Sequence, residues 1–191
     1  SAMYSDTGIR VVRISDVQKG KMSDKDRKFY PPESEPEIQR YMLESGDLVM
    51  SLTGNCGRVA MLSEADLPAA LNQRVACLRP DHEKVLTRYL FHFFDQLSFE
   101  QDAMSNATGG GQKNMSTKWL GAYPVPIPYP ADPQKSLKKQ GEIVQVLDKF
   151  TTLTTSLSEG LPREIELRQK QYEYYRDLLL SFPKPAEAVG A

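Results

Sequence analysis

The last third of the chain is the feature that most constrains its fold. Between residues 134 and 182 the only proline is Pro162, and apolar side chains recur at alternating steps of four and three from Ile143 to Leu161. That spacing keeps side chains on one stripe of a helix. A helix of about 48 residues is roughly 70 Å long, far longer than a small core needs. We predict a long helix whose stripe packs on another long helix; two ordinary helices folded back on the domain are the alternative.

The apolar stripe restarts one residue late after Leu161, next to Gly160 and Pro162. Glycine and an interior proline bend or interrupt helices, so we expect a bend or break at residues 160–162. Aromatic side chains bury large areas at a helix seam. The residues predicted to pair with a partner helix are Ile143, Leu147, Phe150, Leu157, Ile165, Tyr172, Tyr175, Leu179 and Phe182.

The charge of the chain is uneven although its sum is close to zero. The 191 residues carry a net charge of −1, which gives no overall attraction to nucleic acid. Residues 1–30 hold seven basic and four acidic side chains, whereas residues 31–102 hold six basic and twelve acidic ones. Residues 103–131 contain Lys113 and Lys118 but no acidic residue. One face of the protein is therefore expected to be basic.

Cysteine and histidine usage gives no sign of a disulfide framework or a metal site. Cys56 and Cys77 form no CxxC pair, and His82 and His92 lack the spacing of metal ligands. Both cysteines are expected to be buried free thiols. The sequence contains no signal peptide and no run of 18 apolar residues, so a cytoplasmic protein without membrane contact is expected.

The chain before the long helix has the pattern of an α+β fold, with a β-rich mixed domain over residues 4–133. Strands are predicted at residues 9–14, 48–52, 58–62 and 71–78, from β-branched and alternating apolar residues. A polar loop over residues 18–27 and a short helix ending near residue 43 separate the first two strands. An aromatic-rich helix over 87–104, a helical turn over 116–120 and a proline-rich edge strand or connector over 123–128 follow.

The sequence lacks the patterns of common catalytic and nucleotide-binding sites. Gly109, Gly110 and Gly111 do not have phosphate-loop spacing, and neither histidine has an evident nucleophile to activate. The charged run from Asp24 to Lys28 lies in a loop and has no acidic partner on a strand, so it does not indicate a metal-dependent nuclease. We expect no catalysis, no cofactor and no metal.

Two glycine-bearing loops, residues 53–57 and 108–114, favour recognition instead. Both carry amides, and Asn or Gln can bond two edge atoms of adenine, while Arg or Lys can bind guanine or phosphates. An alternative interpretation, that Asn55, Gln112 and Asn114 only form turns, stays open.

Several segments together resemble the specificity (S) subunit of Type I restriction–modification systems. They occur in order along nearly the whole chain, at residues 8–17, 46–57, 71–75, 108–116, 140–144 and 168–179. The Gln-Tyr-Glu-Tyr-Tyr-Arg segment at residues 171–176 is the most specific piece. The resemblance implies a target recognition domain followed by one long family helix. A full S subunit has two such halves, whose helices pair antiparallel as a coiled coil and hold the two recognition domains apart.

The resemblance also implies partners and a division of the chain. Each domain of such a subunit reads one part of a split DNA site, and the helix length sets the gap between the parts. The helix also docks the modification (methyltransferase) subunits and, through them, the restriction subunit. By this resemblance we expect the chain to carry one half, without the strand and loop that usually precede residues 8–17. We therefore expect a recognition domain over 4–133, a spacer helix over 134–182 and a disordered tail over 183–191, with the partner helix coming from a second copy or a second half.

The resulting prediction is a non-catalytic DNA-recognition subunit that directs methylation and cleavage to a bipartite site. The alternative is a coiled-coil assembly protein whose head binds protein rather than DNA. The residues expected to contact DNA are Lys19, Lys21, Lys25, Arg27, Lys28, Asn55, Arg58, Gln112, Lys113, Asn114 and Lys118.

Overall fold

The computed structural model describes residues 4–180, and beyond residue 152 it describes only some of the side chains. The chain divides into two compact units, Ser1–Gln145 and Val146–Ala191. The first unit holds all the described strands and all the described helices except the greater part of the last one, α5.

A three-stranded antiparallel sheet lies at the centre of the first unit. Its order is β7-β6-β9, with β6 at Leu48–Ser51, β7 at Val59–Met61 and β9 at Val75–Leu78. Val49 of β6 lies opposite Ala60 of β7 and Cys77 of β9. All four residues of β6 are buried because both faces of this sheet are covered.

A second sheet covers one face of the central sheet. Its order is β4-β1-β8-β5, at Phe29–Tyr30, Ile9–Val12, Ala69–Leu71 and Met42–Leu43; β1 and β8 are parallel and the other pairs antiparallel. Val12 and Ala69 join Val49 and Ala60 in one apolar cluster. The hairpin β2–β3, at Val17–Gln18 and Lys21–Met22, adds Val17 to it.

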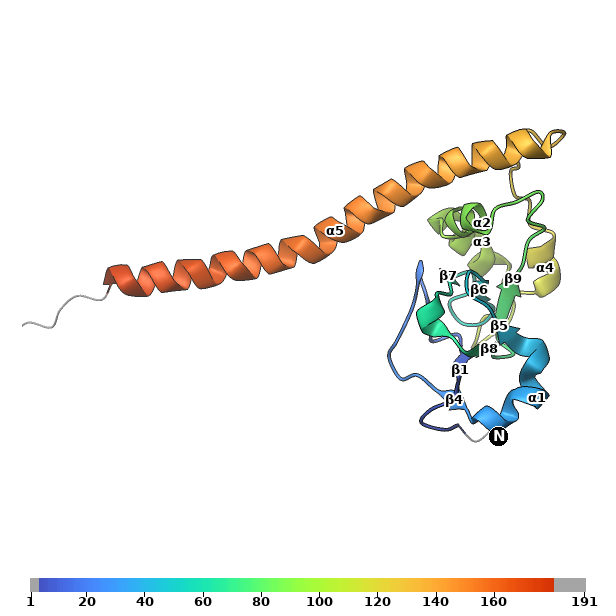
Figure 1. Ribbon diagram of the computed structural model, residues 1–191, viewed down its shortest axis with the longest axis horizontal. Coiled ribbons are helices and arrows are strands. Elements are labelled where there is room, and N and C mark those ends of the chain that lie inside the picture. Colours follow the sequence, from blue (N-terminus) through green and yellow to red (C-terminus); the bar gives the residue numbers. More distant parts are fainter. Residues whose placement is uncertain (1–3, 181–191) are drawn as a thin grey trace, which may run out of the picture. The chain divides into compact units, whose positions relative to one another are not determined.

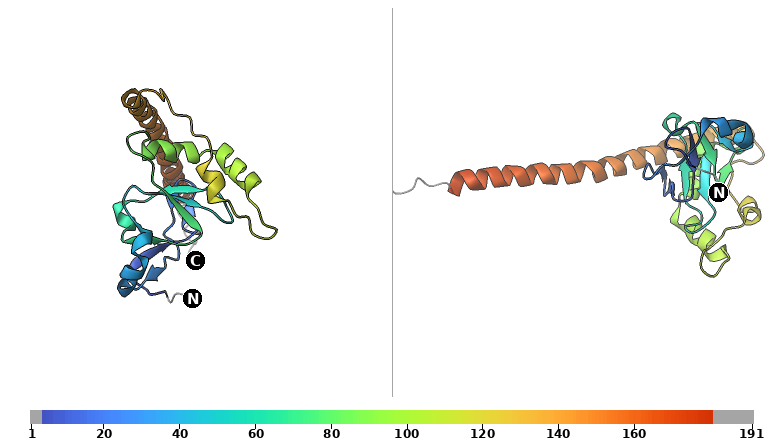
Figure 2. Two further views of the ribbon diagram at one scale, coloured as in Figure 1. Left: turned by 90° about the vertical axis from the view of Figure 1, so that its right-hand side faces the viewer. Right: turned by 90° about the horizontal axis from the view of Figure 1, so that it is seen from below.

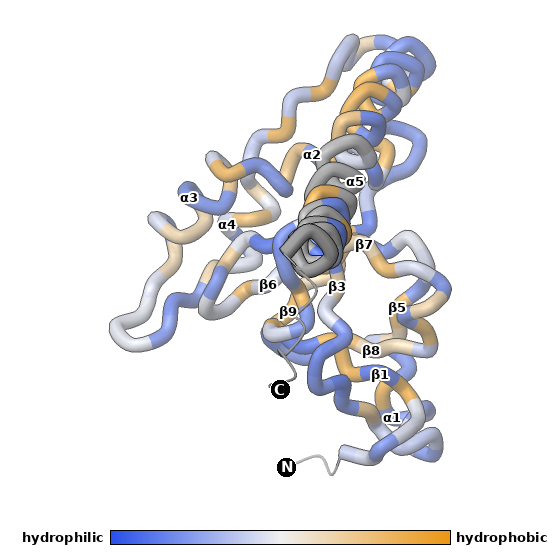
Figure 3. The backbone as a smooth tube through the Cα atoms, turned by 90° about the vertical axis from the view of Figure 1, so that its left-hand side faces the viewer, coloured by the Kyte–Doolittle hydropathy of each residue, from blue (hydrophilic) through white to orange (hydrophobic). Residues whose placement is uncertain are grey.

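Helices cover the opposite face of the central sheet, as Figures 1 and 2 show. Helix α2 at Thr87–Phe94 and helix α3 at Leu97–Asn106 bring aromatic side chains onto Leu48 and Met50 of β6. Helix α4 at Thr117–Gly121 adds Leu120 to this cluster. Short helical turns occur at Pro32–Ser34 (η1), Glu35–Ile38 (α1), Gln39–Tyr41 (η2) and Glu64–Asp66 (η3). Figure 3 shows hydrophobic residues in the strands and helices of these layers and also in the connector between α4 and α5.

Helix α5, Pro133–Leu180, is anchored in the first unit by a buried glutamine. Gln140 has no exposed surface, and its Nε2 donates to the Lys84 carbonyl at 2.9 Å and to Ser136 Oγ at 3.0 Å. The Leu86 N–H donates to Gln140 Oε1 at 2.9 Å. These bonds satisfy a side chain whose burial would otherwise cost about 1–3 kcal/mol.

The long predicted helix is present, and it continues through residues 160–162 where a bend or break was expected. A proline inside a helix removes one backbone hydrogen bond and clashes with the preceding turn, but the helical conformation continues on both sides of Pro162. The structure thus contains one helix across these residues, without the break that was one of the two expected forms. The predicted tail over residues 183–191 lies outside the described residues.

Three other predictions about the elements were wrong in detail. The strand expected over 71–78 is two strands, β8 and β9, which belong to different sheets and meet at a turn around Asn72. The helix expected over 87–104 is two helices, α2 and α3, separated at Asp95 and Gln96. The polar loop over 18–27 contains the β2–β3 hairpin. Residues 123–128 form a connector outside any described strand, one of the two forms expected from their prolines.

The α+β class is confirmed as a mixed structure of sheets and helices. Cys56 is buried and Cys77 is partly buried, and both are free thiols. Burial raises the pKa of Cys77 to about 12, with the Asp47 charge adding to the effect, so this thiol stays protonated. Within residues 4–180, no helix combines the length and the apolar character needed to cross a membrane.

Candidate nucleic-acid interface

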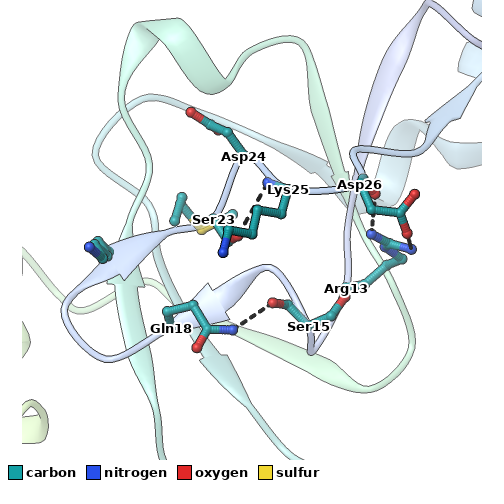
Figure 4. Close-up of a pocket in the computed structure, with 9 residues that line it drawn as sticks. Arg13, Ser15, Gln18, Ser23, Asp24, Lys25 and Asp26 are labelled. Atoms are coloured by element: carbon teal, nitrogen blue, oxygen red, sulfur yellow. Dashed lines mark hydrogen bonds and ion pairs between the residues drawn. The ribbon is translucent and has the colours of Figure 1, made fainter.

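The first candidate surface is the lysine segment, which we define as residues 19–28. It borders a hollow of about 820 Å³ whose walls include Arg13, Lys21, Lys25, Asp24 and Asp26. In Figure 4 the side chains of Arg13 and Asp26 meet at one side of this hollow, while Gln18 donates to the Ser15 carbonyl at 2.7 Å. Basic and acidic groups therefore alternate around the hollow.

Most cations of the lysine segment are already paired with carboxylates. Arg27 bonds Asp24, and Lys28 Nζ lies 2.8 Å from Asp26 Oδ1. The Arg27 hydrogen bond lowers the pKa of Asp24, and the Lys28 hydrogen bond lowers that of Asp26. Lys19 Nζ lies 3.7 Å from Glu100 Oε2. Phosphate contacts by these three cations would compete with the internal pairs.

Arg58, also predicted to contact DNA, is directed into the domain. Its Nε lies 3.3 Å from Glu100 Oε1, and one terminal nitrogen donates to Gln18 Oε1 at 3.1 Å. Only 28% of its side chain is exposed. In contrast, Lys21 and Lys25 are exposed, and no carboxylate of the described residues lies within 4 Å of either.

The second candidate surface is the loop junction, which we define as residues 53–57, the Gln73–Arg74 pair and residues 108–118. The Gly54 N–H donates to the Lys113 carbonyl at 2.8 Å, and the Met115 N–H donates to the Leu52 carbonyl at 2.7 Å. Thr53 Oγ1 donates to Asn114 Oδ1 at 2.8 Å. Two loops that the sequence places about 55 residues apart are thus one structural unit.

Two glycines of the loop junction occupy positions that other residues cannot take without strain. Gly109 has a φ of +121°, and a Cβ there would lie 2.3 Å from the Gln112 carbonyl oxygen. Gly57 has a φ of +87°, and its Cβ would lie 2.8 Å from Ala103 Cβ on α3. Positive φ favours glycine, so these residues fix the shape of the junction and its approach to α3.

The cations of the loop junction pair with no carboxylate that the structure describes. Among the described residues, no carboxylate lies within 4 Å of Arg74, Lys113 or Lys118. Lys113 Nζ donates to the Ala107 carbonyl at 3.4 Å, and Arg74 donates to Gln112 Oε1, also at 3.4 Å. The amide of Asn114 is used internally, by Thr53 and by the Gln112 carbonyl at 3.3 Å. Asn55, by contrast, is exposed.

Sequence reasoning did not select Gln73 and Arg74, which lie beside the predicted residues of the junction. Both were assigned to the interior of a strand, although they are exposed and belong to the turn between β8 and β9. The signal that was available is the run of three polar residues, Asn72 to Arg74, between two apolar segments.

Part of the predicted pairing stripe of α5 can be located. Leu147 is 37% exposed and Phe150 is 61% exposed, and Ile143 is half-buried. The side chains of Leu157, Ile165, Tyr172, Tyr175 and Leu179, and the whole of Phe182, lie outside what the structure describes. Further apolar side chains of the helix, among them Leu161 and Leu167, are more than half exposed. In Figure 3 hydrophobic and hydrophilic residues alternate along the described part of α5.

The described residues include no group of three or more His, Cys, Asp or Glu side chains that could hold a metal ion.

Two solved structures show that the fold of this chain occurs in other proteins. The chain resembles a structure solved for the assembly and conformational transition of a type I R-M system, with a TM-score of 0.63 at 18% identity over 93% of this chain and 40% of that one. It also resembles the S subunit of a Type-I restriction-modification system from M. genitalium, with a TM-score of 0.52 at 15% identity over 92% of this chain and 43% of that chain.

Sequence comparison assigns the family. Residues 3–167 match the model of the Type I restriction modification DNA specificity domain. The chain is 46% identical over 119 residues, 62% of its length, to the EcoR124I/EcoR124II specificity subunit of Escherichia coli, and covers 28% of that subunit. It is 33% identical over 142 residues, 74% of its length, to the putative type I specificity subunit S.MpnORF289P C-terminus of Mycoplasma pneumoniae, and covers 86% of it. The chain belongs to the Type I restriction modification DNA specificity family.

The predicted family is thereby confirmed. The chain spans 28–40% of the length of four curated relatives from Escherichia coli, Haemophilus influenzae and Mycoplasma pneumoniae.

Proposed function

We propose that this chain is the DNA sequence-recognition subunit, or one half of it, in a Type I restriction–modification complex. The family match over residues 3–167 carries the proposal, and the unpaired cations and exposed amides of the loop junction support it. In this role the chain performs no chemistry itself. It directs methylation and cleavage, carried out by modification and restriction subunits, to a split DNA site.

The contacts proposed for DNA follow from how each cation is paired. Lys21, Lys25, Arg74, Lys113 and Lys118 have no carboxylate neighbour among the described residues and are proposed to bind phosphates or base edges. Neutralising phosphates releases counterions, so each such contact adds about 0.9 to the salt dependence of binding. Asn55 and Gln112 are proposed to lie near base edges. The other predicted residues contribute to DNA binding only if DNA replaces their internal partners. They are Lys19, Arg27, Lys28, Arg58 and Asn114.

Residues 4–133 are proposed as the recognition domain and residues 134–182 as the spacer and pairing helix. The exposed apolar residues of α5, such as Leu147 and Phe150, support pairing with a second helix, because removing apolar surface from water is favourable. The partner helix would come from a second copy of this chain or from a second half. The two helices would form an antiparallel coiled coil, and the modification subunits would dock on it.

Selection from random duplexes tests the proposal. The chain is purified in complex with the modification subunits of its host and used to select from a pool of random double-stranded DNA. A split motif with a fixed gap is expected among the selected sequences. A complex that assembles and binds all sequences alike would overturn the proposal and favour an assembly protein whose head binds protein.

A further inference from the structure

The turn between β8 and β9 presents two side chains from a rigid backbone. The Asn72 N–H donates to the Val12 carbonyl and the Val75 N–H to the Asn72 carbonyl, both at 3.0 Å. The Leu52 N–H donates to the Arg74 carbonyl, also at 3.0 Å. The backbone of this turn is therefore fixed to both sheets, while the side chains of Gln73 and Arg74 are exposed. Groups on such a scaffold are placed more reproducibly than groups on a free loop.

Two hollows meet at Gln73. One, of about 610 Å³, has Tyr4, Tyr30 and Tyr41 in its wall, together with Asn72 and Gln73. The other, of about 340 Å³, is lined by Thr53, Arg74, Gln112 and Asn114, and again by Gln73. No acidic residue lines either hollow, whereas Asp24 and Asp26 line the hollow of the lysine segment. An anionic ligand meets less repulsion at the two hollows beside Gln73.

The polar ends of the two exposed side chains are available to a ligand. The Gln73 amide makes no hydrogen bond to any described residue, and Arg74 makes only the 3.4 Å bond to Gln112 and has no carboxylate within 4 Å in the described part of the chain. The Arg40 guanidinium lies 4.5 Å from the ring centre of Tyr41, which lines the larger hollow.

We propose that Gln73 and Arg74 are specificity-determining residues that read base edges of double-stranded DNA. A glutamine amide matches the adenine N6 and N7 positions, and a guanidinium matches guanine O6 and N7. The tyrosine wall beside Gln73 supplies the apolar surface that a thymine methyl or a sugar contacts, and Lys113 and Lys118 supply nearby cations for phosphates. This inference rests on the proposed function, and it assigns base reading to a turn rather than to the glycine-rich loop.

Protein partners also use tyrosine-rich surfaces, and three glutamates (Glu33, Glu35 and Glu37) precede the Tyr41 side of the larger hollow. The observations favour DNA because the groups that line both hollows are neutral or basic. Docking of a modification subunit on this surface is the competing outcome of the test.

The test uses the chain in complex with modification subunits, first as wild type to define the motif. Relative affinities are then measured for duplexes that vary one base pair of the motif at a time. Gln73→Ala and Arg74→Ala are expected to lose discrimination at one position each, by roughly 5- to 150-fold, with the other positions unchanged. Gln101→Ala, a change in an exposed glutamine of α3 that lines neither hollow, is the matched control and is expected to keep every preference.

Each remaining outcome decides the matter. A wild-type motif retained by both variants overturns the inference but leaves the proposed function standing, whereas a wild-type complex without any motif overturns the proposed function itself.

For Arg74, a uniform loss of affinity across all sequences with a lower salt slope identifies a phosphate contact and overturns base reading. Arg74→Lys is expected to keep the salt slope and lose the base preference. Thermal melting confirms that the variants are folded. Folded variants that no longer bind modification subunits identify a protein surface and overturn the inference.

Discussion

The lysine segment and the loop junction both carry the residues expected for DNA binding, but they use their charges differently. The lysine segment is the more highly charged region, yet Arg27, Lys28 and Lys19 are paired with carboxylates. The loop junction holds only Arg74, Lys113 and Lys118, and no carboxylate of the described residues pairs with them. We therefore expect attraction to phosphates to depend on which cations are unpaired rather than on how many there are.

The largest expected effect comes from disrupting the loop junction at Gly57. Gly57→Val places a side chain at a φ of +87° and 2.8 Å from Ala103 Cβ. Strain and overpacking together are expected to lower the free energy of unfolding by about 2–4 kcal/mol, measured by urea denaturation. Gly54→Ala is the matched control, because Gly54 has a φ of +75° but no atom near its Cβ position. A Gly57→Val protein as stable as Gly54→Ala would contradict the close approach to α3.

A matched pair of triple variants tests the comparison itself. Arg74→Ala, Lys113→Ala and Lys118→Ala combined are expected to lower the salt slope of DNA binding by about two units, since Lys113 and Lys118 are proposed to bind phosphates and Arg74 to read a base edge. Lys19→Ala, Arg27→Ala and Lys28→Ala combined are expected to lower it by about one unit or less. The slopes are measured from affinities at several salt concentrations. Equal losses in the two triples would show that internal ion pairing does not decide which cations contact DNA.

Removing the carboxylates that pair with cations of the lysine segment tests the comparison of the two regions in the opposite direction. Asp24→Asn with Asp26→Asn removes two negative charges and frees Arg27 and Lys28. DNA affinity at low salt is expected to rise roughly threefold to tenfold, and the gain should shrink as salt screens it. Asp81→Asn is the control, because it frees Lys84 at another site. A double variant with unchanged affinity would place the lysine segment away from the DNA.

The smallest expected effect concerns an ion pair outside both regions. Burial raises the pKa of Asp47, but bonds from Arg79, at 2.6 Å, and from the Glu44 N–H, at 2.9 Å, bring it below its usual 3.8. A lowered folded-state pKa means that the stabilisation is present above pH 3.8 and is lost as pH falls through the folded-state value. Asp47→Asn is expected to cost about 1 kcal/mol at pH 7 and less at pH 3, by urea denaturation. A cost that grows at low pH would contradict this sign.

The sequence predicts elements well where a pattern is long and local. Helix α5 was expected from apolar residues that recur over dozens of positions, and its limits, Pro133 and Leu180, lie close to those predicted. The strand expected over 71–78 was wrong because only three polar residues, Asn72 to Arg74, separate the apolar residues of β8 from those of β9. Periodicity does not reveal that β8 and β9 belong to different sheets, which is decided by non-local pairing with β1 and β6.

The residue types of the candidate site were predictable from the sequence, but the partners of their hydrogen bonds and ion pairs were not. The two glycine-bearing loops were identified from their composition, and the structure joins them through Gly54 and Lys113. Arg58 was expected to be available, but its partner Glu100 lies 42 residues further along the chain, and no local pattern links the two. Gln140 likewise gave no sign of its role, because its partners are backbone groups of residues 84–86 and a serine one turn before it.

The most direct test of the central claim is to map methylated bases in the DNA of cells that express this chain with its modification subunits. The account predicts new methylation at a split motif with a fixed gap: a palindromic motif if two copies of this half act together, and an asymmetric one if a different second half is present. A stable complex that adds no sequence-specific methylation would contradict the assignment of this chain as a DNA specificity subunit.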